Sequence, residues 1–287
     1  MKDKNPISIN GSGISPKKAN LNFFEENKIK KINTTSPHSV NIPGAVHAWH
    51  SMHKKFGKLD FEELFLTAEK YAREGYPVYE VSAKSWKENI KKLKLHPPTN
   101  AIFLKNNNSF KCGEIHKNIN LAKTLKLIGK NGTKDFYNGT IANDIVKTLN
   151  KLGGLHSMED FATQNTIFTE SLSNHYKEIK LHQCPPNGPG ITVLIIMALL
   201  EKFDTKNINP MGVDRFHLQA EATKIAYEQR ELLIGDPNFN DFNFKNLIEP
   251  KYINNLAKKI SFNSCYKPVN NSITAHPETI YLTVVDK

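Results

Sequence analysis

The last residues of the 287-residue chain, ETIYLTVVDK at 278–287, decide the fold that we expect. From Thr279 onward the run consists mostly of β-branched, aromatic and aliphatic residues and contains no Gly or Pro, which predicts a buried strand. The residues before it, 263–278, are polar and typical of a flexible connection. Because a buried strand needs partners and no segment follows this one, we expect the chain to be incomplete.

Thr279 stands where an N-terminal nucleophile would stand. In such enzymes self-cleavage makes a Thr, Ser or Cys the first residue of a new chain, and its freed α-amino group then acts as the base. That amine titrates near neutral pH, whereas an unperturbed lysine does not. The pattern alone leaves the alternative open that Thr279 is an ordinary strand residue, because threonine is common in strands.

Helical patterns dominate the rest of the chain. We expect loops or short strands over residues 1–42, helices over 45–56, 60–74, 141–152, 191–203 and 214–233, and a strand over 179–183. Asp60 is the expected N-cap of the second helix, with Glu63 completing an acidic capping box, and Gly75 is its expected C-cap. The predicted apolar face of the helix over 60–74 consists of Phe61, Leu64, Phe65, Ala68 and Ala72. That of the helix over 141–152 consists of Ile141, Ile145, Leu149 and Leu152. One side of the helix over 214–233 is predicted to carry Phe216, Ala220, Thr223, Ala226 and Tyr227.

The composition, with 39% hydrophobic and 23% charged residues, is ordinary for a soluble globular protein. The net charge of +11 could indicate an anionic partner, but the lysines are scattered and indicate a solvated surface rather than a nucleic-acid interface. The longest apolar run, 191–200, is shorter than the roughly 18 residues of a membrane span. We therefore expect neither a nucleic-acid nor a membrane partner, and a basic nucleic-acid-binding protein is kept only as an alternative.

Metal and phosphate sites are not expected. His47, His50 and His53 follow one another at three-residue steps, so on a helix the outer two diverge. The three cysteines are far apart and form no C-x-x-C pair, which predicts neither a disulfide framework nor a zinc site. GKNGTK at 129–134 lacks the Walker spacing and predicts a helix end. PPNGPG at 185–190 fits a rigid corner or a close ligand approach equally well.

Segments in matching order along nearly the whole chain resemble the gamma-glutamyltranspeptidases. They are VNIPGAV (40–46), KFGKL (55–59), AREGYPV (72–78), DFYNG (135–139) with Ile141 and Ala142, Gly153 and Gly154 with EDF (159–161), PPNGPGI (185–191), His217, Glu221, Ala222, KIA (224–226), Arg230, GDP (235–237) and ETIYLTVVD (278–286). The last segment resembles the family's processing junction and assigns the nucleophile to Thr279.

The resemblance implies an α/β (α+β) fold, the αββα sandwich of N-terminal-nucleophile hydrolases, incomplete here and dominated by the helix-rich large subunit. It implies that residues 1–278 are the N-terminally incomplete large-subunit region and 279–287 the first strand of a truncated small subunit. Self-cleavage between Glu278 and Thr279 would precede gamma-glutamyl transfer or hydrolysis through an acyl-enzyme ester. The partners would be a small gamma-glutamyl or amide substrate and the protein's own small subunit as a heterodimer, with no cofactor and no metal.

The chain departs from the family pattern in three ways. Ser12 occupies the position of an arginine that grips the substrate α-carboxylate, which argues against glutathione as the substrate. Gln229 replaces an Asp that commonly precedes the helix Arg. The upstream Gly-rich helix and the small subunit with its oxyanion-hole glycines are not matched, so we expect this chain alone to be inactive.

Two further hypotheses stay open at the level of sequence: a cephalosporin-acylase-like amidase, and a non-catalytic truncated remnant of the family. The start of the chain carries no apolar region typical of a signal peptide. Relatives with leaders are exported, and a cytoplasmic location is open to those without, so the compartment, cytoplasmic or periplasmic, stays undecided.

Overall fold

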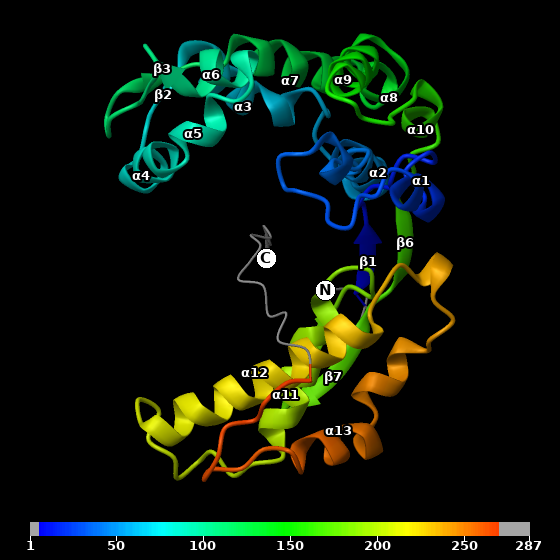
Figure 1. Cartoon of the computed structure of the whole chain (residues 1–287), viewed down its shortest axis with the longest axis vertical. Coiled ribbons are helices and arrows are strands. Elements are labelled where there is room, and N and C mark those ends of the chain that lie inside the picture. Colours follow the sequence, from blue (N-terminus) through cyan, green and yellow to red (C-terminus); the bar gives the residue numbers. More distant parts are fainter. Residues whose placement is uncertain (1–5, 270–287) are drawn as a thin grey trace. The chain divides into compact units, whose positions relative to one another are not determined.

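The computed structural model describes residues 6–269, which fold into two compact units (Figure 1). One unit comprises Ile9–Ile167, and the other comprises residues 168–269 together with residues 6–8. Strands β1 (Ile7–Asn10) and β6 (Ile167–Glu170), within which the chain passes between the units, pair in a two-stranded sheet. Helices dominate the described residues, as the sequence predicted, and the strands pair only in twos.

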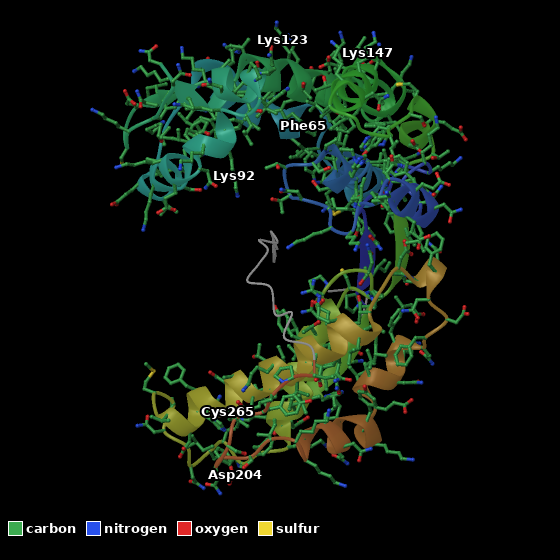
Figure 2. The ribbon with its side chains drawn as sticks, viewed as in Figure 1. Phe65, Lys92, Lys123, Lys147, Asp204 and Cys265 are labelled. Carbon is green, nitrogen blue, oxygen red and sulfur yellow. The ribbon has the colours of Figure 1, made fainter. Side chains whose placement is uncertain are left out.

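The unit Ile9–Ile167 is built on packed helices. They are α1 (Leu21–Glu26), α2 (Ala45–Phe56), α3 (Glu63–Glu74), α7 (Ile119–Asn131), α8 (Lys134–Asn138), α9 (Thr140–Lys151) and α10 (Met158–Ala162), with a 3₁₀ turn at Pro37–Ser39. Their core contains Ile42, Val46, Phe65, Ile128, Phe136, Tyr137, Ala142, Val146 and Phe161. Phe65 of α3, labelled in Figure 2, packs against α7 at Gly129, where an added Cβ would lie only 3.3 Å from the Phe65 Cβ.

A smaller aromatic cluster closes the far end of this unit. It is formed by α4 (Glu80–Glu88), α5 (Ile90–Leu93), α6 (Pro97–Phe103) and the paired strands β2 (Tyr76–Pro77) with β5 (Ile115–His116) and β3 (Leu104–Lys105) with β4 (Asn108–Ser109). The buried His116 ring lies 5.0 Å from Trp86, and its Nε2–H donates to the Ile102 carbonyl at 2.9 Å. The cluster therefore holds this end together around one histidine.

The other unit is organised around the apolar helix α11 (Gly190–Glu201), which buries residues on nearly all sides. The hairpin of β7 (Leu172–Tyr176) and β8 (Ile179–Gln183) packs on it, as do α12 (Val213–Leu233) and α13 (Pro250–Ala257). Short 3₁₀ turns at Pro237–Phe239 and Phe244–Ile248 connect the last two helices. A helix that is apolar all round needs cover on every side, and these elements supply it.

Several elements confirm the sequence predictions. α2 spans the predicted residues, and β8 likewise begins and ends where it was predicted. α9 differs from its predicted range by one residue at each end, and PPNGPG is a turn that leads into α11. Gly75 is the C-cap of α3 at φ 99°, a conformation that favours glycine. GKNGTK is indeed a helix end, where Gly132 closes α7 at φ 61°.

The predicted N-cap at Asp60 is wrong. α3 begins at Glu63 after a turn in which the Glu63 N–H donates to the Asp60 carbonyl, and no side chain caps the helix. Asp60 therefore acts through its backbone, one turn before the helix. The predicted capping chemistry is found instead at α10, where Ser157 and Asp160 form a complete capping box.

Some predicted helix faces are also wrong. Leu64 and Ala68 of α3 are exposed, whereas Phe65 and Ala72 are buried. In α12 only Ala226 of the predicted face is buried. The buried residues of that helix are Leu218, Glu221, Ala222, Ile225, Ala226, Glu228 and Gln229. Glu221 and Glu228 are on this buried side, and a search for apolar periodicity cannot detect buried carboxylates.

The positions of the exposed lysines agree with the prediction that basic residues are scattered over a solvated surface. Lys92, Lys123 and Lys147 lie exposed on three different helices (Figure 2). Within residues 6–269, no helix combines the length and the apolar character that crossing a bilayer requires.

Candidate functional site

A glycine-lined turn presents Ser12 beside the start of α2. Gly13 has φ +85°, and an added Cβ would lie 2.0 Å from the Ile42 carbonyl oxygen. At Gly44, which precedes α2, a Cβ would lie 2.2 Å from the Gly11 carbonyl oxygen. The Ile42 N–H donates to the Ile14 carbonyl at 2.8 Å. The two backbone segments are thus in direct contact, and a side chain at either glycine would separate them.

Ser12 itself is exposed at the tip of this turn. Its backbone N–H and its hydroxyl both donate to Asn10 Oδ1, at 3.0 and 2.7 Å. The turn therefore has a defined shape, and at the position that the resemblance assigns to an arginine it carries a neutral hydroxyl.

Tyr137 makes hydrogen bonds to the backbone just before α2 and in its first turn. Its hydroxyl donates to the Pro43 carbonyl at 2.6 Å and accepts the His47 N–H at 3.0 Å. The side chain is buried, and this burial, which outweighs the hydrogen bond from His47, raises the pKa of Tyr137 to about 12. Tyr137 thus joins DFYNG to VNIPGAV, two of the family-like segments.

Asp160 makes a second such link. One carboxylate oxygen accepts the Lys17 N–H at 3.0 Å, and the other accepts the N–H and hydroxyl of Ser157 at 2.9 and 2.6 Å. Burial alone would raise the pKa of Asp160, but these hydrogen bonds stabilise the ionised form and hold its pKa below the ordinary value. The residues that follow the Ser12 turn are thereby fixed to α10.

In the other unit, two buried carboxylates of α12 hold the last described segment, residues 261–269. The Tyr266 N–H donates to Glu221 Oε2 at 2.5 Å, and the Val269 N–H donates to Glu228 Oε1 at 2.7 Å. Lys224 of the same helix pairs with Glu221 and donates to the Tyr266 carbonyl at 2.9 Å. We call residues 261–269 the strap, because α12 fixes it through backbone groups.

Glu228 has further partners besides the Val269 N–H. It also accepts the Tyr266 hydroxyl at 2.7 Å and lies 3.6 Å from Lys259 Nζ. Burial would raise the pKa of Glu228, but the hydrogen bonds from Tyr266 and Val269 and the charge of Lys259 lower it. Burial and the hydrogen bond to Glu228 in turn raise the pKa of Tyr266. The ionised carboxylate is thus the form that the strap requires.

The structure gives a physical reason for a glutamine at position 229, where the family commonly has an Asp. Its Nε2 donates to Glu228 Oε2 at 3.3 Å, and its Oε1 accepts the Tyr252 hydroxyl at 2.5 Å. Glu228 and Gln229 are both buried on α12, and Tyr252 comes from α13. An Asp at this position would place a second negative charge beside Glu228, which a low-polarity environment disfavours.

The predicted nucleophile and cleavage residue, Thr279 and Glu278, lie outside the described residues. The strap ends at Val269, in the part of the chain that leads toward them. Glu221 and Glu228 were not predicted from the sequence as the residues that hold this segment. The only signal in the sequence is their position on the helix predicted over 214–233, which carries several family-like residues.

The three helix histidines do not converge. His47 Nδ1 lies 2.8 Å from the Thr166 hydroxyl, His53 Nε2 donates to the Leu59 carbonyl at 2.6 Å, and His50 packs edge-on against Phe61. A different group does converge: His217, Glu221 and Cys265 bring potential ligand atoms within 4.8 Å of one another. This group was not predicted from the sequence, although His217 and Glu221 have the i, i+4 spacing of residues on one helix face.

Comparison with known proteins gives a consistent result. The family model described as Gamma-glutamyltranspeptidase matches residues 1–287. The chain is 30% identical over 296 residues to the glutathione hydrolase proenzyme of Escherichia coli (strain K12), covering 100% of this chain and 51% of that protein. It is 28% identical over 280 residues to the glutathione hydrolase-like YwrD proenzyme of Bacillus subtilis (strain 168), covering 96% and 52%. The chain thus spans about half the length of these curated relatives.

Solved structures show the same fold. The gamma-glutamyltranspeptidase of Helicobacter pylori matches with a TM-score of 0.83 at 24% identity, covering 96% of this chain and 84% of that one. The cephalosporin acylase of Bacillus halodurans matches with a TM-score of 0.82 at 26% identity, covering 88% and 48%. The predicted fold class, that of the N-terminal-nucleophile hydrolases, is therefore confirmed.

Replacing Tyr137 by Phe should loosen the start of α2. The variant leaves the half-buried Pro43 carbonyl and His47 N–H without their partner, at a cost of about 1–3 kcal/mol. Hydrogen exchange of a peptide spanning residues 43–50 should become faster, as measured by mass spectrometry. Tyr71→Phe, on an exposed ring of the same unit, is the control. Unchanged exchange in Tyr137→Phe would contradict the assigned role.

Replacing Glu228 by Gln should release the strap in a pH-dependent way. Because the folded-state pKa of Glu228 is lowered, its stabilising contribution is present above the ordinary value of 4.5 and is lost as pH falls through the folded value. At neutral pH we expect a loss of about 1.5–3 kcal/mol, the range for hydrogen bonds to a charged group. Exchange of strap amides, measured from neutral to acidic pH, should therefore differ between wild type and variant only at the higher pH.

The exposed Glu231→Gln on the same helix is the matched control for charge. If Glu231→Gln and Glu228→Gln gave the same exchange profile, the strap would not depend on the buried carboxylate.

Proposed function

The chain belongs to the gamma-glutamyltranspeptidase family, and on that premise we propose that it comes from an N-terminal-nucleophile hydrolase or transferase that acts on gamma-glutamyl or related amides. The observation that carries the proposal is the family match over residues 1–287, which includes the junction-like segment 278–286. The names of the relatives, glutathione hydrolase proenzymes, support a precursor that is activated by cleavage.

In the proposed maturation the Thr279 hydroxyl attacks the carbonyl carbon of Glu278. The C–N bond between the two residues breaks, the Thr279 nitrogen takes up the proton, and an ester forms that water hydrolyses to the free Glu278 carboxylate. Thr279 then carries a free α-amino group beside its hydroxyl, which is the nucleophile-and-base pair that this enzyme class requires. The same hydroxyl would form the acyl-enzyme ester with the substrate.

The described structure supports this proposal through the strap. Cleavage at a specific bond requires that the bond be presented in one conformation, because positioning contributes much of the rate of an intramolecular reaction. Glu221 and Glu228 fix the backbone at Tyr266 and Val269, in the last described part of the chain before the proposed cleavage bond in the sequence. The partner would be the small subunit that cleavage releases, and residues 1–278 would be the large-subunit region. The 287-residue chain alone is expected to be inactive.

The decisive experiment replaces Thr279 by Ala in the complete protein. Without the hydroxyl no ester can form, so we expect a single uncut species, whereas wild type gives two, one of which begins at Thr279. Intact mass and N-terminal sequencing measure this directly. Thr283→Ala, in the same predicted strand, is the matched control and should mature normally.

Normal cleavage of the Thr279→Ala protein would show that another residue is the nucleophile. An uncut wild-type protein in its source cells would favour the alternative, a non-catalytic remnant of the family.

A cephalosporin-acylase-like amidase is the second candidate, favoured by Ser12. Ser12 provides no cation for the α-carboxylate of a gamma-glutamyl group. We therefore expect Ser12→Arg in the mature protein to lower KM for a gamma-glutamyl anilide by about 10-fold or more, because a charge-assisted hydrogen bond contributes about 1.5–3 kcal/mol. Steady-state kinetics against an anilide of an uncharged acyl group should show no such gain.

Ser15→Arg, on another exposed residue of the same turn region, adds the same charge and is the control. Equal effects of the two substitutions would indicate general attraction of an anion and would remove Ser12 from the binding site.

A further inference from the structure

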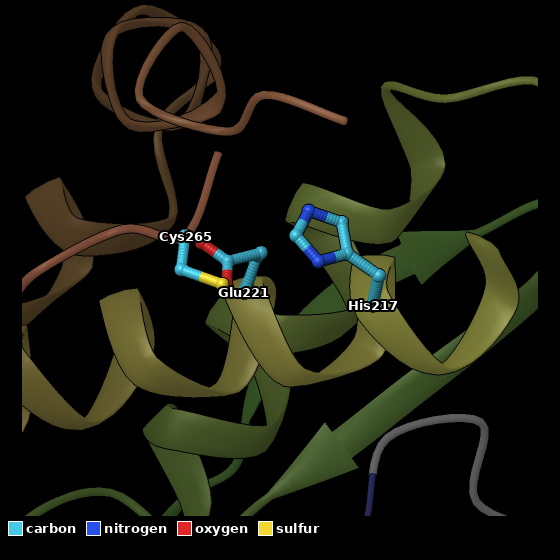
Figure 3. Close-up of side chains that lie close together, drawn as sticks. All are labelled: His217, Glu221 and Cys265. Carbon is cyan, nitrogen blue, oxygen red and sulfur yellow. The ribbon is translucent and has the colours of Figure 1, made fainter. Parts of the chain in front are cut away.

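The three residues His217, Glu221 and Cys265 gather on one side of α12 (Figure 3). His217 and Glu221 lie one helical turn apart, and Cys265 comes from the strap, which crosses the helix there. One potential ligand atom from each residue lies within 4.8 Å of the other two. All three residues belong to the same unit, so the fold of that unit alone brings them together.

His217 is already oriented as a metal ligand would be. Its Nε2 lies 2.8 Å from the Ser261 carbonyl oxygen, which can only accept a hydrogen bond, so Nε2 carries the proton. In the neutral ring Nδ1 then carries the lone pair. A histidine that donates from one ring nitrogen to a backbone carbonyl and ligates through the other is the common arrangement at metal sites. The strap thus supplies the supporting carbonyl as well as the cysteine.

Glu221 provides a negative charge in a buried position. The residue is 1% exposed, and its two oxygens are held by the Tyr266 N–H and by Lys224. Each carboxylate oxygen has two acceptor positions, so each keeps one for a cation. The ammonium of Lys224 opposes a bound cation, but the Cys265 thiolate that forms on metal binding adds a second negative charge and restores a net negative ligand set.

We propose that His217, Glu221 and Cys265 form a binding site for a zinc-like divalent cation. The nitrogen, oxygen and sulfur donors are those that Zn²⁺ prefers. With bond lengths of about 2.0–2.3 Å, tetrahedral Zn²⁺ separates its ligand atoms by about 3.3–3.8 Å. The observed limit of 4.8 Å requires a shift of roughly one ångström, which an exposed Cys265 on the strap can supply. Because Cys265 is exposed, water can occupy the fourth coordination position of the cation.

A cation bound here would link α12 to the strap at Cys265, in addition to the hydrogen bonds at Tyr266 and Val269. It would therefore stabilise the strap, which precedes the proposed cleavage residues in the sequence. The site stands or falls independently of the proposed enzymatic activity, because its test needs neither cleavage nor turnover.

The test is a titration of the purified chain with Co²⁺, a spectroscopic substitute for Zn²⁺. We expect a single bound Co²⁺ per chain with a thiolate-to-cobalt charge-transfer band, which Zn²⁺ abolishes by displacement. Zn²⁺ should also raise the melting temperature. Cys265→Ser should remove the band and weaken Zn²⁺ binding by about 10-fold or more, and His217→Gln should weaken it similarly.

Cys265→Ser is the principal variant, because the residue is exposed and its loss leaves the buried contacts of α12 intact. Circular dichroism confirms that each variant is folded. Cys184→Ser and His175→Gln, both exposed and in the same unit, are the matched controls and should bind as wild type does. Absence of the band in the folded wild type, its persistence in Cys265→Ser or its loss in Cys184→Ser would each overturn the proposal.

Discussion

The burial of two carboxylates on α12 is the constraint on which the last described part of the chain depends. Removing an ionised carboxylate from water costs several kcal/mol unless hydrogen bonds or opposite charges replace the lost hydration. Glu221 and Glu228 obtain this replacement from the backbone of the strap, together with Lys224 and Lys259. Most residues of the strap are exposed, including Cys265 and Val269, and Tyr266 packs against the apolar core. Helix and strap therefore stabilise each other mainly through polar contacts.

The other unit uses the same principle with different groups. Tyr137 and Asp160 are buried polar side chains, and each satisfies backbone groups that lie far away in the sequence. Their partners are in the segments around Pro43 and Lys17, which shape the turn that presents Ser12. Several of the family-like segments are thus explained by structure rather than by chemistry. They keep backbone segments in contact, and the glycines at 13 and 44 allow that contact to be close.

This division of roles bears on how the proposed activity could change within the family. The residues that maintain the framework, such as Tyr137 and Asp160, are buried, and each has several partners. Ser12, in contrast, is exposed and bonds within its own turn. A substitution there alters the charge offered to a ligand. Gln229 belongs with the framework residues, because its buried side-chain amide forms hydrogen bonds with Glu228 and Tyr252.

The sequence by itself determined the family, the helix-rich fold and the positions of several elements. α2 and β8 were predicted with their correct bounds, because glycines, prolines and apolar periodicity act locally. It also assigned Thr279 as the nucleophile, which stays a prediction. Only the tertiary structure decided which face of α12 is buried and that Glu221 and Glu228 lie on it. The convergence of His217, Glu221 and Cys265 likewise depends on the strap crossing α12. The physical reason is that a buried polar group is specified by partners distant in the chain, and periodicity records only the neighbours of a residue along its own helix.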